Sequence, residues 1–459
     1  MGIFKACDIR GVWGRDLTTG DAYRLGRAAA RLTTRGAGTL VAGDVRLSTP
    51  VLKEALCRGL VDGGSRVRDA GTLTTPAFYF AVRRTDAALG VMVTASHNPA
   101  EYNGFKLLVD QRPVLPEEPA ALQKAMAGEC PSPGTGSRRR EPGWLDRYRS
   151  FVVNCFRRDG ALKVVVDCGS GACSLVAPGA FRSLGYRTTP LYCDPDGRFL
   201  HRPPNPAVAE NLAALCRRVT AQGAALGVAY DGDGDRVAFV DETGRPLDSD
   251  RVLALLARHL LARERGVVVY DTKCSQVVAE EVARCGGTPV MARSGHAFVG
   301  REFRERAALL AGELSGHFFW RDLGFDDGLF TSLALAEMIR ESGLPLSELD
   351  RSLPRYPVTP DIRLPFAGDP AVLMEEVANR LSAYPLSRAD GIRVDLGGAW
   401  GLIRPSITEP LVTMRCEGKT RDGLARVVDL MVGALPGDLG SRAAAAAAPW
   451  RNGVPGDGR

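Results

Sequence analysis

The chain has 459 residues and a mass of 49.1 kDa, which is too long for one compact core and predicts three or four domains. Apolar residues make up 45% and charged residues 24%, a balance that excludes a disordered or fibrous protein. The net charge is +6, but the basic residues are scattered, and their one dense run, residues 138–140, lies beside a Pro-, Gly- and Ser-rich stretch. We interpret this run as a solvated linker rather than a nucleic-acid surface.

In the first unit, residues 38–43 read as a strand, 49–63 as a helix and 88–94 as a strand that runs directly into Ser96. Residues 128–143 are rich in Pro, Gly and Ser and are expected to link this unit to the next. Short apolar strands go on alternating with helical stretches along most of the chain, which predicts an α/β architecture.

A second unit opens with a strand at residues 162–166, followed by the glycine-rich residues 167–171 and a helix. A strand, a glycine-rich turn and a helix are also typical of dinucleotide binding. The GxGxxG pattern is incomplete here, however, and the acidic residue expected after a second strand is missing, so we do not favour that function. A third unit begins near Asp250, with strands at residues 266–270 and 288–292.

Beyond Pro354 the pattern changes to α+β, with strands at residues 362–364, 391–395 and 411–416. From Pro436 onward, Gly, Pro and a run of six alanines predict a disordered tail. The boundaries that we predict are residues 1–143, 144–249, 250–354 and 355–436 for four domains, and residues 437–459 for the tail.

Cysteine usage and hydropathy bear on the cellular compartment. Eleven cysteines occur without a CxxC pair, and the amino-terminal residues contain no apolar segment typical of a secretory signal. This pattern predicts reduced thiols and a cytoplasmic location. The most apolar helical stretch, residues 252–261, is interrupted by Arg258 and His259, so we expect no membrane span. We expect neither a nucleic acid nor a membrane as a partner, and a monomer or a weak dimer.

Three aspartates occur at alternate positions in residues 231–236, between apolar runs that predict strands on both sides. Asp231, Asp233 and Asp235 can fold around one hard cation that takes oxygen ligands, and the glycines between them allow the tight backbone that this requires. An EF-hand does not fit, because Arg236 stands where that loop needs glycine and the flanking segments read as strands. The sequence therefore predicts a Mg²⁺ site.

Ser96 follows a predicted strand and precedes His97, Asn98 and Pro99. Because proline disfavours helix at the residue before it, we expect the serine to be presented on a turn, with Lys106 a short distance further along the chain. No GxSxG motif supports acyl transfer. A serine combined with a divalent metal and several cations suits phosphoryl transfer, in which catalysis consists mostly of positioning and charge neutralisation.

Two further peptides carry polar side chains at alternate positions. On extended backbone, Glu313, Ser315 and His317 would point to one side, where they could read sugar hydroxyls. In the last unit, one guanidinium and two hydroxyls could clamp a phosphate; these groups belong to Arg404, Ser406 and Thr408. A polar turn without a binding role is the alternative for both peptides.

Taken together and in this order, these four peptides resemble the four active-site loops of the α-phosphohexomutase family, one from each of four domains. Residues 94–99 resemble its phosphoserine loop, 231–236 its metal loop, 313–317 its sugar-specificity loop and 404–408 its phosphate-binding loop. The resemblance covers almost the whole chain up to residue 435 and includes shorter matches around Arg10, Lys273 and His296. One departure is Cys7, where relatives often carry an aromatic residue.

The resemblance implies three similar α/β domains with mixed sheets and a smaller α+β domain around a central cleft. It implies an intramolecular phosphotransferase that interconverts hexose 1-phosphate and hexose 6-phosphate. Phospho-Ser96 would give its phosphoryl group to the sugar and recover the other phosphate from the bisphosphorylated intermediate. Mg²⁺ would be the cofactor, a hexose 1,6-bisphosphate the activator, and sugar phosphates the partners.

The resemblance also implies a role for each matched residue. The metal ligands would be Ser96, Asp231, Asp233 and Asp235. Positive charge near the transferred group would come from Lys106 and Arg236. The candidates for proton transfer are Arg10, His97 and His317. The substrate would be held by Lys273, His296, Glu313, Ser315, His317, Arg404, Ser406 and Thr408.

The preferred sugar stays open at this point. Glucose and mannose differ only at C2, so a loop that reads the 3- and 4-hydroxyls would accept both. Leu314 stands where the phosphomannomutase/phosphoglucomutase branch usually has Met and phosphoglucosamine mutases tend to have Gln, which favours the first branch and leaves the second as the alternative. A metal-dependent phosphohydrolase would normally need several zinc-binding histidines, and the chain has five, dispersed. A silent sugar-phosphate-binding protein would be expected to lack Ser96 or one of the aspartates.

Overall fold

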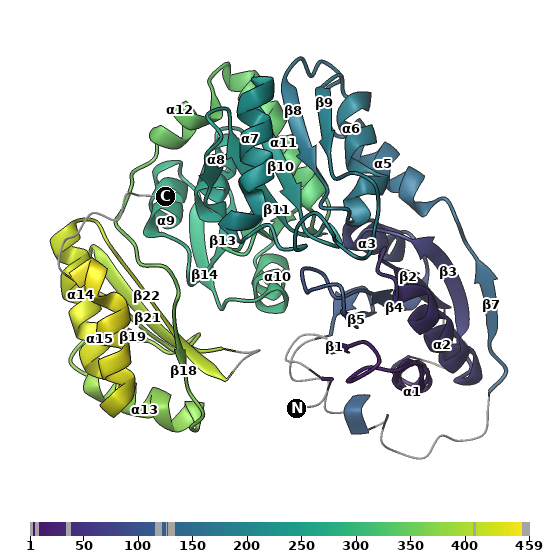
Figure 1. Cartoon of the computed structure of the whole chain (residues 1–459), viewed down its shortest axis with the longest axis horizontal. Helices are drawn as coiled ribbons and strands as arrows, with labels where there is room; N and C mark the ends of the chain where they lie inside the picture. The colour runs from purple at the N-terminus through teal and green to yellow at the C-terminus, as the bar shows by residue number, and fades with distance from the viewer. Residues whose placement is uncertain are drawn as a thin grey trace.

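The computed structural model describes residues 3–4, 9–33, 38–114, 122–124, 126, 134–406 and 410–451. These residues form four sheets, and the four domains built on them follow one another along an arc, with the first and the last at its two ends (Figure 1). The α/β architecture and the number of domains agree with the prediction. Within the described residues, no helix is long and apolar enough to cross a membrane.

The first sheet is mixed and has the strand order β1-β5-β4-β2-β3-β7, with β6 paired to β5. Strand β2 runs parallel to β3 and β4, whereas β5 is antiparallel to β4 and β1. Its strands are β1 (Ile9–Val12), β2 (Gly38–Gly43), β3 (Arg66–Thr72), β4 (Ala87–Val93), β5 (Tyr102–Val109), β6 (Arg112–Pro113) and β7 (Ser137–Arg140). Its helices are α1 (Thr19–Ala29), α2 (Thr49–Asp62) and α3 (Thr75–Arg83).

The arginine run expected in a linker is an edge strand instead. Residues 137–140 form β7, which pairs with β3 in parallel. Arg138 donates hydrogen bonds to Glu54 (2.6 Å) and Asp69 (2.7 Å), so these two carboxylates attach the strand to the first domain. The linker prediction is wrong for these residues. The segment is polar, but its backbone pairing with β3 and its ion pairs hold it in the sheet.

The second and third sheets share one topology. Their strand orders are β12-β11-β10-β8-β9 and β17-β16-β15-β13-β14, with the last three strands of each order parallel. The second domain contains α5 (Trp144–Asn154), β8 (Lys163–Asp167), η1 (Ala172–Leu175), α6 (Ala177–Ser183), β9 (Arg187–Leu191), η2 (Ala209–Leu212), α7 (Ala213–Gln222), β10 (Leu226–Tyr230), β11 (Val237–Asp241) and β12 (Pro246–Leu247). The third contains α8 (Ser249–Leu261), β13 (Val267–Asp271), α9 (Gln276–Arg284), β14 (Thr288–Ala292), α10 (His296–Glu305), β15 (Leu310–Gly312), β16 (Phe318–Trp320), β17 (Phe325–Asp326), α11 (Gly328–Ser342) and α12 (Leu346–Arg351).

One connection recurs in these three domains. Strand β4 leads into the antiparallel β5, β10 into β11 and β15 into β16. Residues 94–99, 231–236 and 313–317 lie in these three connections. The fold therefore presents three of the four predicted peptides at equivalent places.

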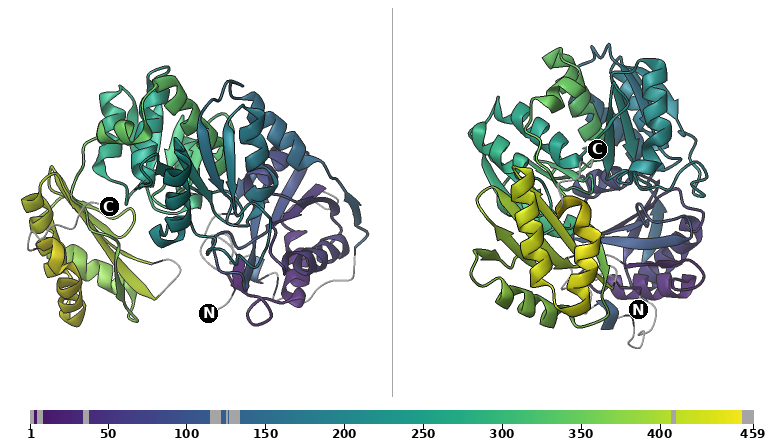
Figure 2. Two further views of the ribbon diagram at one scale, coloured as in Figure 1. Left: turned by 45° about the horizontal axis from the view of Figure 1, so that its top comes forward. Right: turned by 60° about the vertical axis from the view of Figure 1, so that its left-hand side comes forward.

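The fourth domain has an antiparallel sheet with the order β18-β22-β21-β20-β19. Its strands are β18 (Ile362–Pro365), β19 (Leu386–Ser387), β20 (Ile392–Asp395), β21 (Ala399–Pro405) and β22 (Leu411–Gly418). Its helices are α13 (Pro370–Arg380), α14 (Arg421–Ala434) and α15 (Gly437–Arg451). Figure 2 shows α14 and α15 side by side against this sheet.

The predicted disordered tail is wrong for residues 437–451, which form α15. Leu439, Ala443 and Ala447 are buried, at the four-residue spacing that places side chains on one face of a helix. The alanine run is therefore a helix former whose apolar face packs on the sheet. Residues 452–459 lie outside the described part.

Apolar packing joins three of the four domains. One continuous cluster contains side chains from the first, second and third domains, including Phe80, Tyr148, Leu256 and Phe330. The fourth domain has a separate cluster. The first three domains are thus packed as one body, in which their three recurring connections can meet.

The packing of α15 gives a first prediction. Ala443→Asp places a carboxylate in the apolar contact between α15 and the sheet, and should lower the free energy of unfolding of the fourth domain by about 3 kcal/mol. Urea denaturation would measure the change. Ala445→Asp, on the exposed side of the same helix, is the control and should cost less than about 1 kcal/mol. Equal effects of the two variants would show that α15 does not pack on the domain.

Candidate active site

The three aspartates lie in the connection between β10 and β11, which pair as an antiparallel hairpin. Gly234 adopts a φ of +84°, in the left-handed region that glycine tolerates, and this lets the loop turn back sharply. All three carboxyl groups are fully buried, and one oxygen of each lies within 4.8 Å of the others. The backbone therefore gathers three negative groups at one point.

Ser96 meets this loop from the first domain. It lies on a turn after β4, as predicted, and its own φ is +48°. Its Oγ donates a hydrogen bond of 2.7 Å to Asp231 Oδ2. The serine hydroxyl and the aspartate cluster, separated by 135 residues in the chain, thus form one group of oxygen atoms.

The cluster has the donors that a hard divalent cation requires. Asp233 Oδ1 and Asp235 Oδ1 are buried and have no hydrogen-bond partner among the described residues. A buried carboxylate oxygen without a partner is costly, and a cation removes that cost. With Ser96 Oγ beside Asp231, these oxygens fit the all-oxygen coordination that Mg²⁺ prefers.

Lys106, on β5, balances two of the three charges. Its Nζ donates to Asp233 Oδ2 at 2.9 Å and also to Asp235 Oδ2. Burial raises the pKa of these carboxyls, but the charge of Lys106, together with hydrogen bonds to Asp233 and further positive charge near Asp235, outweighs it, so the pKa of Asp233 falls and that of Asp235 is about 2. Burial and the two neighbouring aspartates raise the pKa of Asp231 well above its usual range. Lys106 therefore compensates Asp233 and Asp235 but does not contact Asp231, which lies next to Ser96.

His97 lies within reach of the serine. Its Nδ1 is 3.3 Å from Ser96 Oγ. Burial, together with the positive charges of Arg236 and Arg10, lowers the pKa of His97 well below its usual value. The neutral form of this imidazole is therefore favoured beside the serine. Arg10, on β1, is held in the same region by a hydrogen bond from its Nη1 to Asn98 Oδ1.

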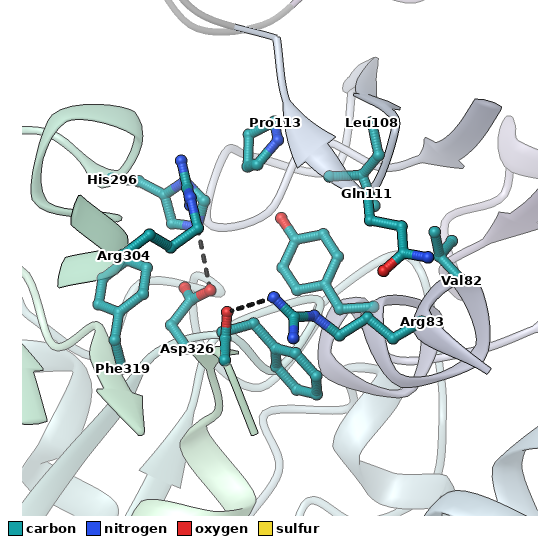
Figure 3. Close-up of a pocket in the computed structure, with 12 residues that line it drawn as sticks. Val82, Arg83, Leu108, Gln111, Pro113, His296, Arg304, Phe319 and Asp326 are labelled. Atoms are coloured by element: carbon teal, nitrogen blue, oxygen red, sulfur yellow. Dashed lines mark hydrogen bonds and ion pairs between the residues drawn. The ribbon is translucent and has the colours of Figure 1, made fainter. Parts of the chain in front are cut away.

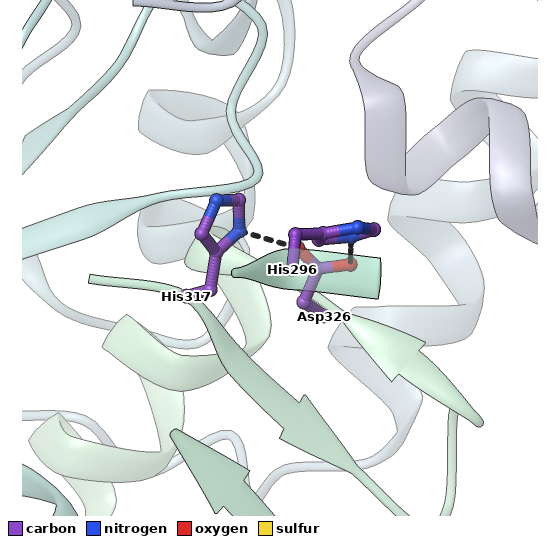
Figure 4. A group of neighbouring side chains, drawn as sticks. All are labelled: His296, His317 and Asp326. Carbon is purple, nitrogen blue, oxygen red and sulfur yellow. Dashed lines mark hydrogen bonds and ion pairs between the residues drawn. The ribbon is translucent and has the colours of Figure 1, made fainter. Parts of the chain in front are cut away.

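A chain of hydrogen bonds connects the metal loop to the third domain. Arg236 Nε donates to His317 Nε2 at 2.8 Å, and His317 Nδ1 lies 2.6 Å from Asp326 Oδ2. The other oxygen of Asp326 lies 3.0 Å from His296 Nε2, so one carboxylate holds two imidazoles (Figure 4). These contacts give His317 a proton on Nδ1 and leave Nε2 as the acceptor from Arg236.

Burial lowers the pKa of His296, but the Asp326 carboxylate outweighs burial and the net shift is upward. Asp326 itself has a pKa far below its usual range, because the two imidazoles overcome the effect of burial. The group is therefore held together by opposite charges rather than by neutral hydrogen bonds alone.

Residues 313–317 form a turn, which corrects the expectation of extended backbone. Gly316 N donates to the carbonyl of Glu313, and Glu313 N donates to the carbonyl of His317, both at 3.0 Å. Ser315 Oγ donates to Glu313 Oε2 at 3.2 Å, whereas His317 is directed to Asp326. Glu313 Oε1 is buried and has no hydrogen-bond partner within the described part of the chain. Glu313 and Ser315 thus act together, with one carboxylate oxygen left to accept a hydrogen bond.

The candidate phosphate clamp lies at the junction of the third and fourth domains. Lys273 Nζ lies 3.2 Å from Asp361, and Arg404 Nε lies 3.0 Å from Asp390. Ser406 N donates to the Leu411 carbonyl at 2.8 Å. Thr408 lies outside the described residues. Lys273 is therefore paired across the junction with the fourth domain, Arg404 is paired within the fourth domain, and the structure shows neither in contact with Ser96.

The comparisons with known proteins agree along the whole chain. Models of phosphoglucomutase/phosphomannomutase alpha/beta/alpha domains I, II and III match residues 1–129, 144–244 and 248–356, and the model of the C-terminal domain matches residues 362–434. The chain belongs to the phosphoglucomutase/phosphomannomutase family.

Individual relatives of this family are similar over nearly their full lengths. The phosphomannomutase/phosphoglucomutase of Pseudomonas aeruginosa is 37% identical, over 93% of this chain and 93% of its own. A phosphoglucomutase of Neisseria gonorrhoeae is 35% identical, over 93% of this chain and 95% of its own. A crystal structure of a phosphoglucomutase/phosphomannomutase family protein from Burkholderia thailandensis has a TM-score of 0.87 at 35% identity, covering 97% of this chain and 98% of that one.

Sequence reasoning missed Asp326, which orients two histidines in this family member. The residue stands between Phe325 and Asp327, in the short strand β17 and before α11. Its only signal in the sequence is a pair of aspartates after an aromatic residue, and the second of the pair, Asp327, caps α11 by accepting from Phe330 N at 2.9 Å. The neighbouring sequence does not distinguish Asp327, which caps α11, from Asp326, which orients the two histidines.

Arg46 is a second residue that sequence reasoning missed. It is 1% exposed, and its guanidinium donates to four backbone carbonyls of the serine loop. Nη1 bonds to the carbonyls of Pro99 and Tyr102 at 2.6 and 2.9 Å, and Nη2 bonds to those of Ser96 and Asn98 at 2.8 and 2.6 Å. Asp44 lies 3.2 Å from Arg46 Nε and compensates the buried charge.

The Arg46 contacts explain how the serine keeps an unfavourable backbone conformation. A non-glycine residue at positive φ costs about 1–3 kcal/mol, and it persists only where the surroundings hold it. The guanidinium fixes the carbonyl of Ser96 and three others in the same turn. Arg46 is therefore a positioning residue for the serine hydroxyl.

A pocket lies beside the His296–Asp326 pair, between the first and third domains (Figure 3). Its walls come from α3, β5 and β6 on one side and from α10, β16 and β17 on the other. Arg83 of α3 donates to the Gly324 carbonyl at 3.0 Å across this contact, and Arg304 of α10 lines the opposite wall. The pocket shares His296 and Asp326 with the group that holds His317. It is therefore part of the contact between the first and third domains, beside the candidate active site.

The aspartate loop gives a prediction about metal binding. Asp231→Asn removes the carboxylate that has no lysine partner, and should weaken the affinity for Mg²⁺ by about 10–100-fold. Isothermal titration with Mg²⁺ or Mn²⁺ would measure the affinity. Asp146→Asn, which removes one charge from the exposed face of α5 in the same domain, is the control and should bind as the wild type does. Equal affinities of Asp231→Asn and the wild type would mean that the metal binds elsewhere.

Proposed function

We propose that the chain is a phosphohexomutase that interconverts hexose 1-phosphate and hexose 6-phosphate, of mannose, glucose or both, through phospho-Ser96. The observation that carries this proposal is the 2.7 Å hydrogen bond from Ser96 Oγ to Asp231, in a buried cluster that also holds two carboxylate oxygens without a hydrogen-bond partner among the described residues. A serine in this position can carry a phosphoryl group while nearby cations compensate its charge. The names of the relatives in the family support the same reaction.

In the proposed cycle, phospho-Ser96 gives its phosphoryl group to one hydroxyl of a bound hexose monophosphate. The P–O bond to Ser96 breaks as a P–O bond to the sugar forms, which yields a hexose 1,6-bisphosphate. After this intermediate has reversed its orientation in the site, its other phosphoryl group returns to Ser96. Free hexose 1,6-bisphosphate would act as the activator because it can phosphorylate Ser96.

The aspartates and two cations would compensate the charge of the transferred group. Asp231, Asp233 and Asp235, together with Ser96, would hold Mg²⁺, which when bound supplies positive charge against the phosphoryl oxygens. Lys106 supports this role, because it already neutralises the far side of the aspartate cluster. Arg236 supports it as well, because its hydrogen bond to His317 fixes the guanidinium close to the loop.

Proton transfer is expected at two oxygens, that of the serine and that of the sugar hydroxyl. The neutral His97, with Nδ1 3.3 Å from Ser96 Oγ, is suited to exchange a proton with the serine. Arg10 and His317 remain candidates at the sugar. Both ring nitrogens of His317 are already engaged, by Arg236 and Asp326, so the sugar would have to displace Arg236 before this imidazole could accept a proton.

The rest of the substrate would be held by the other two loops. The unpartnered Oε1 of Glu313 is suited to accept a hydrogen bond from a sugar hydroxyl, with Ser315 bound to the other oxygen. Lys273, Arg404 and Ser406 would take the second phosphate, joined by Thr408 and His296. The substrate phosphate would then compete with Asp361 and Asp390 for the two cations.

The preferred sugar is inferred from the names of relatives and from the charges in the site. Relatives with nearly equal identity carry both mannose and glucose in their names, which agrees with a loop that reads hydroxyls common to the two sugars. Phosphoglucosamine mutase remains the alternative. An amino group at C2 would bring an ammonium charge into a site that already contains Lys106, Arg236 and Arg10, so we expect it to be disfavoured.

The role of the serine has a direct test. Intact-mass analysis of the purified protein should find one phosphate, and peptide mapping should locate it on Ser96. Ser96→Ala should lose this phosphate and lower kcat by about 1,000-fold or more, because no other group can carry the phosphoryl group. Ser174→Ala, which removes a half-buried hydroxyl without a hydrogen-bond partner in the described structure, should keep both the phosphate and the activity. Full activity of Ser96→Ala would refute the mechanism.

The choice of sugar is tested by comparing kcat/KM for mannose 1-phosphate, glucose 1-phosphate and glucosamine 1-phosphate, with Mg²⁺ and a trace of bisphosphate. We expect the first two values to agree within about tenfold and the third to be lower by about 100-fold, since a buried like charge costs a few kcal/mol. Rapid turnover of glucosamine 1-phosphate alone would assign the chain to the other branch.

A further inference from the structure

Two cysteines of the second domain bring their sulfur atoms together behind the metal loop. Cys168 follows β8 and Cys193 follows the neighbouring parallel strand β9, and the two Sγ atoms lie 3.3 Å apart. Both thiols are free in this structure. A disulfide bond has a sulfur–sulfur distance of about 2.05 Å, so the sulfur atoms need to approach by only about 1.2 Å.

The two thiols differ in a way that suits oxidation in two steps. Cys193 is partly exposed, whereas Cys168 is 1% exposed. The hydrogen bond that the two thiols share lowers the pKa of Cys193, and burial raises the pKa of Cys168 well above its usual value. A peroxide therefore meets the more acidic and more accessible thiol first, with the buried thiol already beside it.

We propose that Cys168 and Cys193 form a regulatory disulfide when the protein meets hydrogen peroxide. The Cys193 thiolate attacks one peroxide oxygen and becomes a sulfenic acid, while the O–O bond breaks and the other oxygen leaves as hydroxide. The Cys168 sulfur then attacks the sulfenic sulfur, and the S–S bond forms as the hydroxyl group leaves. That group takes the Cys168 proton and departs as water. A small thiol reverses the reaction by thiol–disulfide exchange.

Cys168 is connected to the metal loop by a short and tightly turned stretch of backbone. The Cys168 carbonyl accepts from Gly171 N at 2.8 Å, and the next residue, Ala172, donates to the Gly232 carbonyl at 2.9 Å. Gly232 stands between the metal-binding aspartates. Between the two contacts, Gly169 and Ser170 adopt φ values of +51° and +59°.

The fit of this stretch against the metal loop leaves little room for movement. A Cβ atom on Gly171 would lie 2.8 Å from the Gly232 carbonyl, so the two backbones already touch. A shift of Cys168 on closure of the disulfide therefore reaches the backbone that positions Asp231 and Asp233. We expect the disulfide to slow the mutase, a consequence that rests on the proposed function, whereas the disulfide itself does not.

Peptide mapping tests the disulfide on the full-length protein. After treatment with hydrogen peroxide, alkylation and trypsin digestion without reduction, peptides 164–182 and 188–198 should be joined, and dithiothreitol should separate them. Because peptide 164–182 also contains Cys173, fragmentation should assign the bond to Cys168. Cys193→Ser should abolish the joined species and Cys173→Ser should retain it. A bond to Cys173, or Cys193 oxidised beyond the sulfenic acid with Cys168 still alkylated, would overturn the proposal.

The regulatory consequence has its own measurement. Oxidised wild-type protein should lose about tenfold or more in kcat/KM, because a displacement near 1 Å at a catalytic loop has large effects, and dithiothreitol should restore it. Cys193→Ser should keep its activity under the same oxidation, and Cys216→Ser, which removes another partly exposed thiol of this domain, should be inhibited as the wild type is. An unchanged activity of the joined form would overturn the regulatory role. Inactivity of the reduced wild type towards hexose phosphates would instead refute the proposed function.

Discussion

Three buried carboxylates that face one another repel, and the centre of this protein is built around that repulsion. Asp231, Asp233 and Asp235 are brought together by a single hairpin loop. Lys106, the cation that contacts Asp233 and Asp235, does not belong to this loop. The compensating groups come from the first domain, in which Lys106 contacts two of the carboxylates and Ser96 donates to the third. The interactions that join these two domains are therefore the same ones that arrange the serine beside the three carboxylates.

The same loop determines how the third domain attaches. Its last residue, Arg236, donates to His317, and Val237 N donates to the Gly316 carbonyl at 3.1 Å. Asp326 then holds His317 and His296 together. Three equivalent connections, one from each α/β domain, thus meet at one point. At this point they are joined by hydrogen bonds rather than by apolar side chains. This polar junction lies at the edge of a continuous apolar core, which supplies the rigidity that precise positioning requires.

The fourth domain follows a different principle. It has its own core, and its contacts with the third domain are largely polar, such as that of Arg393 with the Thr272 carbonyl at 2.7 Å and that of Glu417 with Gln276 N at 2.9 Å. Interfaces of this kind permit relative motion of domains. Lys273 and Arg404 are already paired with carboxylates, so we expect a substrate phosphate to exchange partners rather than to fill an empty site.

The sequence by itself determined the family resemblance and predicted which residues form the centre. The aspartates stand at alternate positions between two strands, and the serine stands at the end of another strand, shortly before an Asn-Pro pair. Both could be predicted from the local sequence, because a few neighbouring residues set the shape of each loop. Only the tertiary structure revealed Arg46 and Asp326, whose partners Ser96 and His317 lie in other segments, and it alone showed that residues 313–317 turn and that residues 437–451 form a helix. Arg46 and Asp326 act through contacts with other segments, and α15 is held by burial of its apolar face; the turn at residues 313–317 is closed by backbone hydrogen bonds, which an alternation of polar residues does not specify.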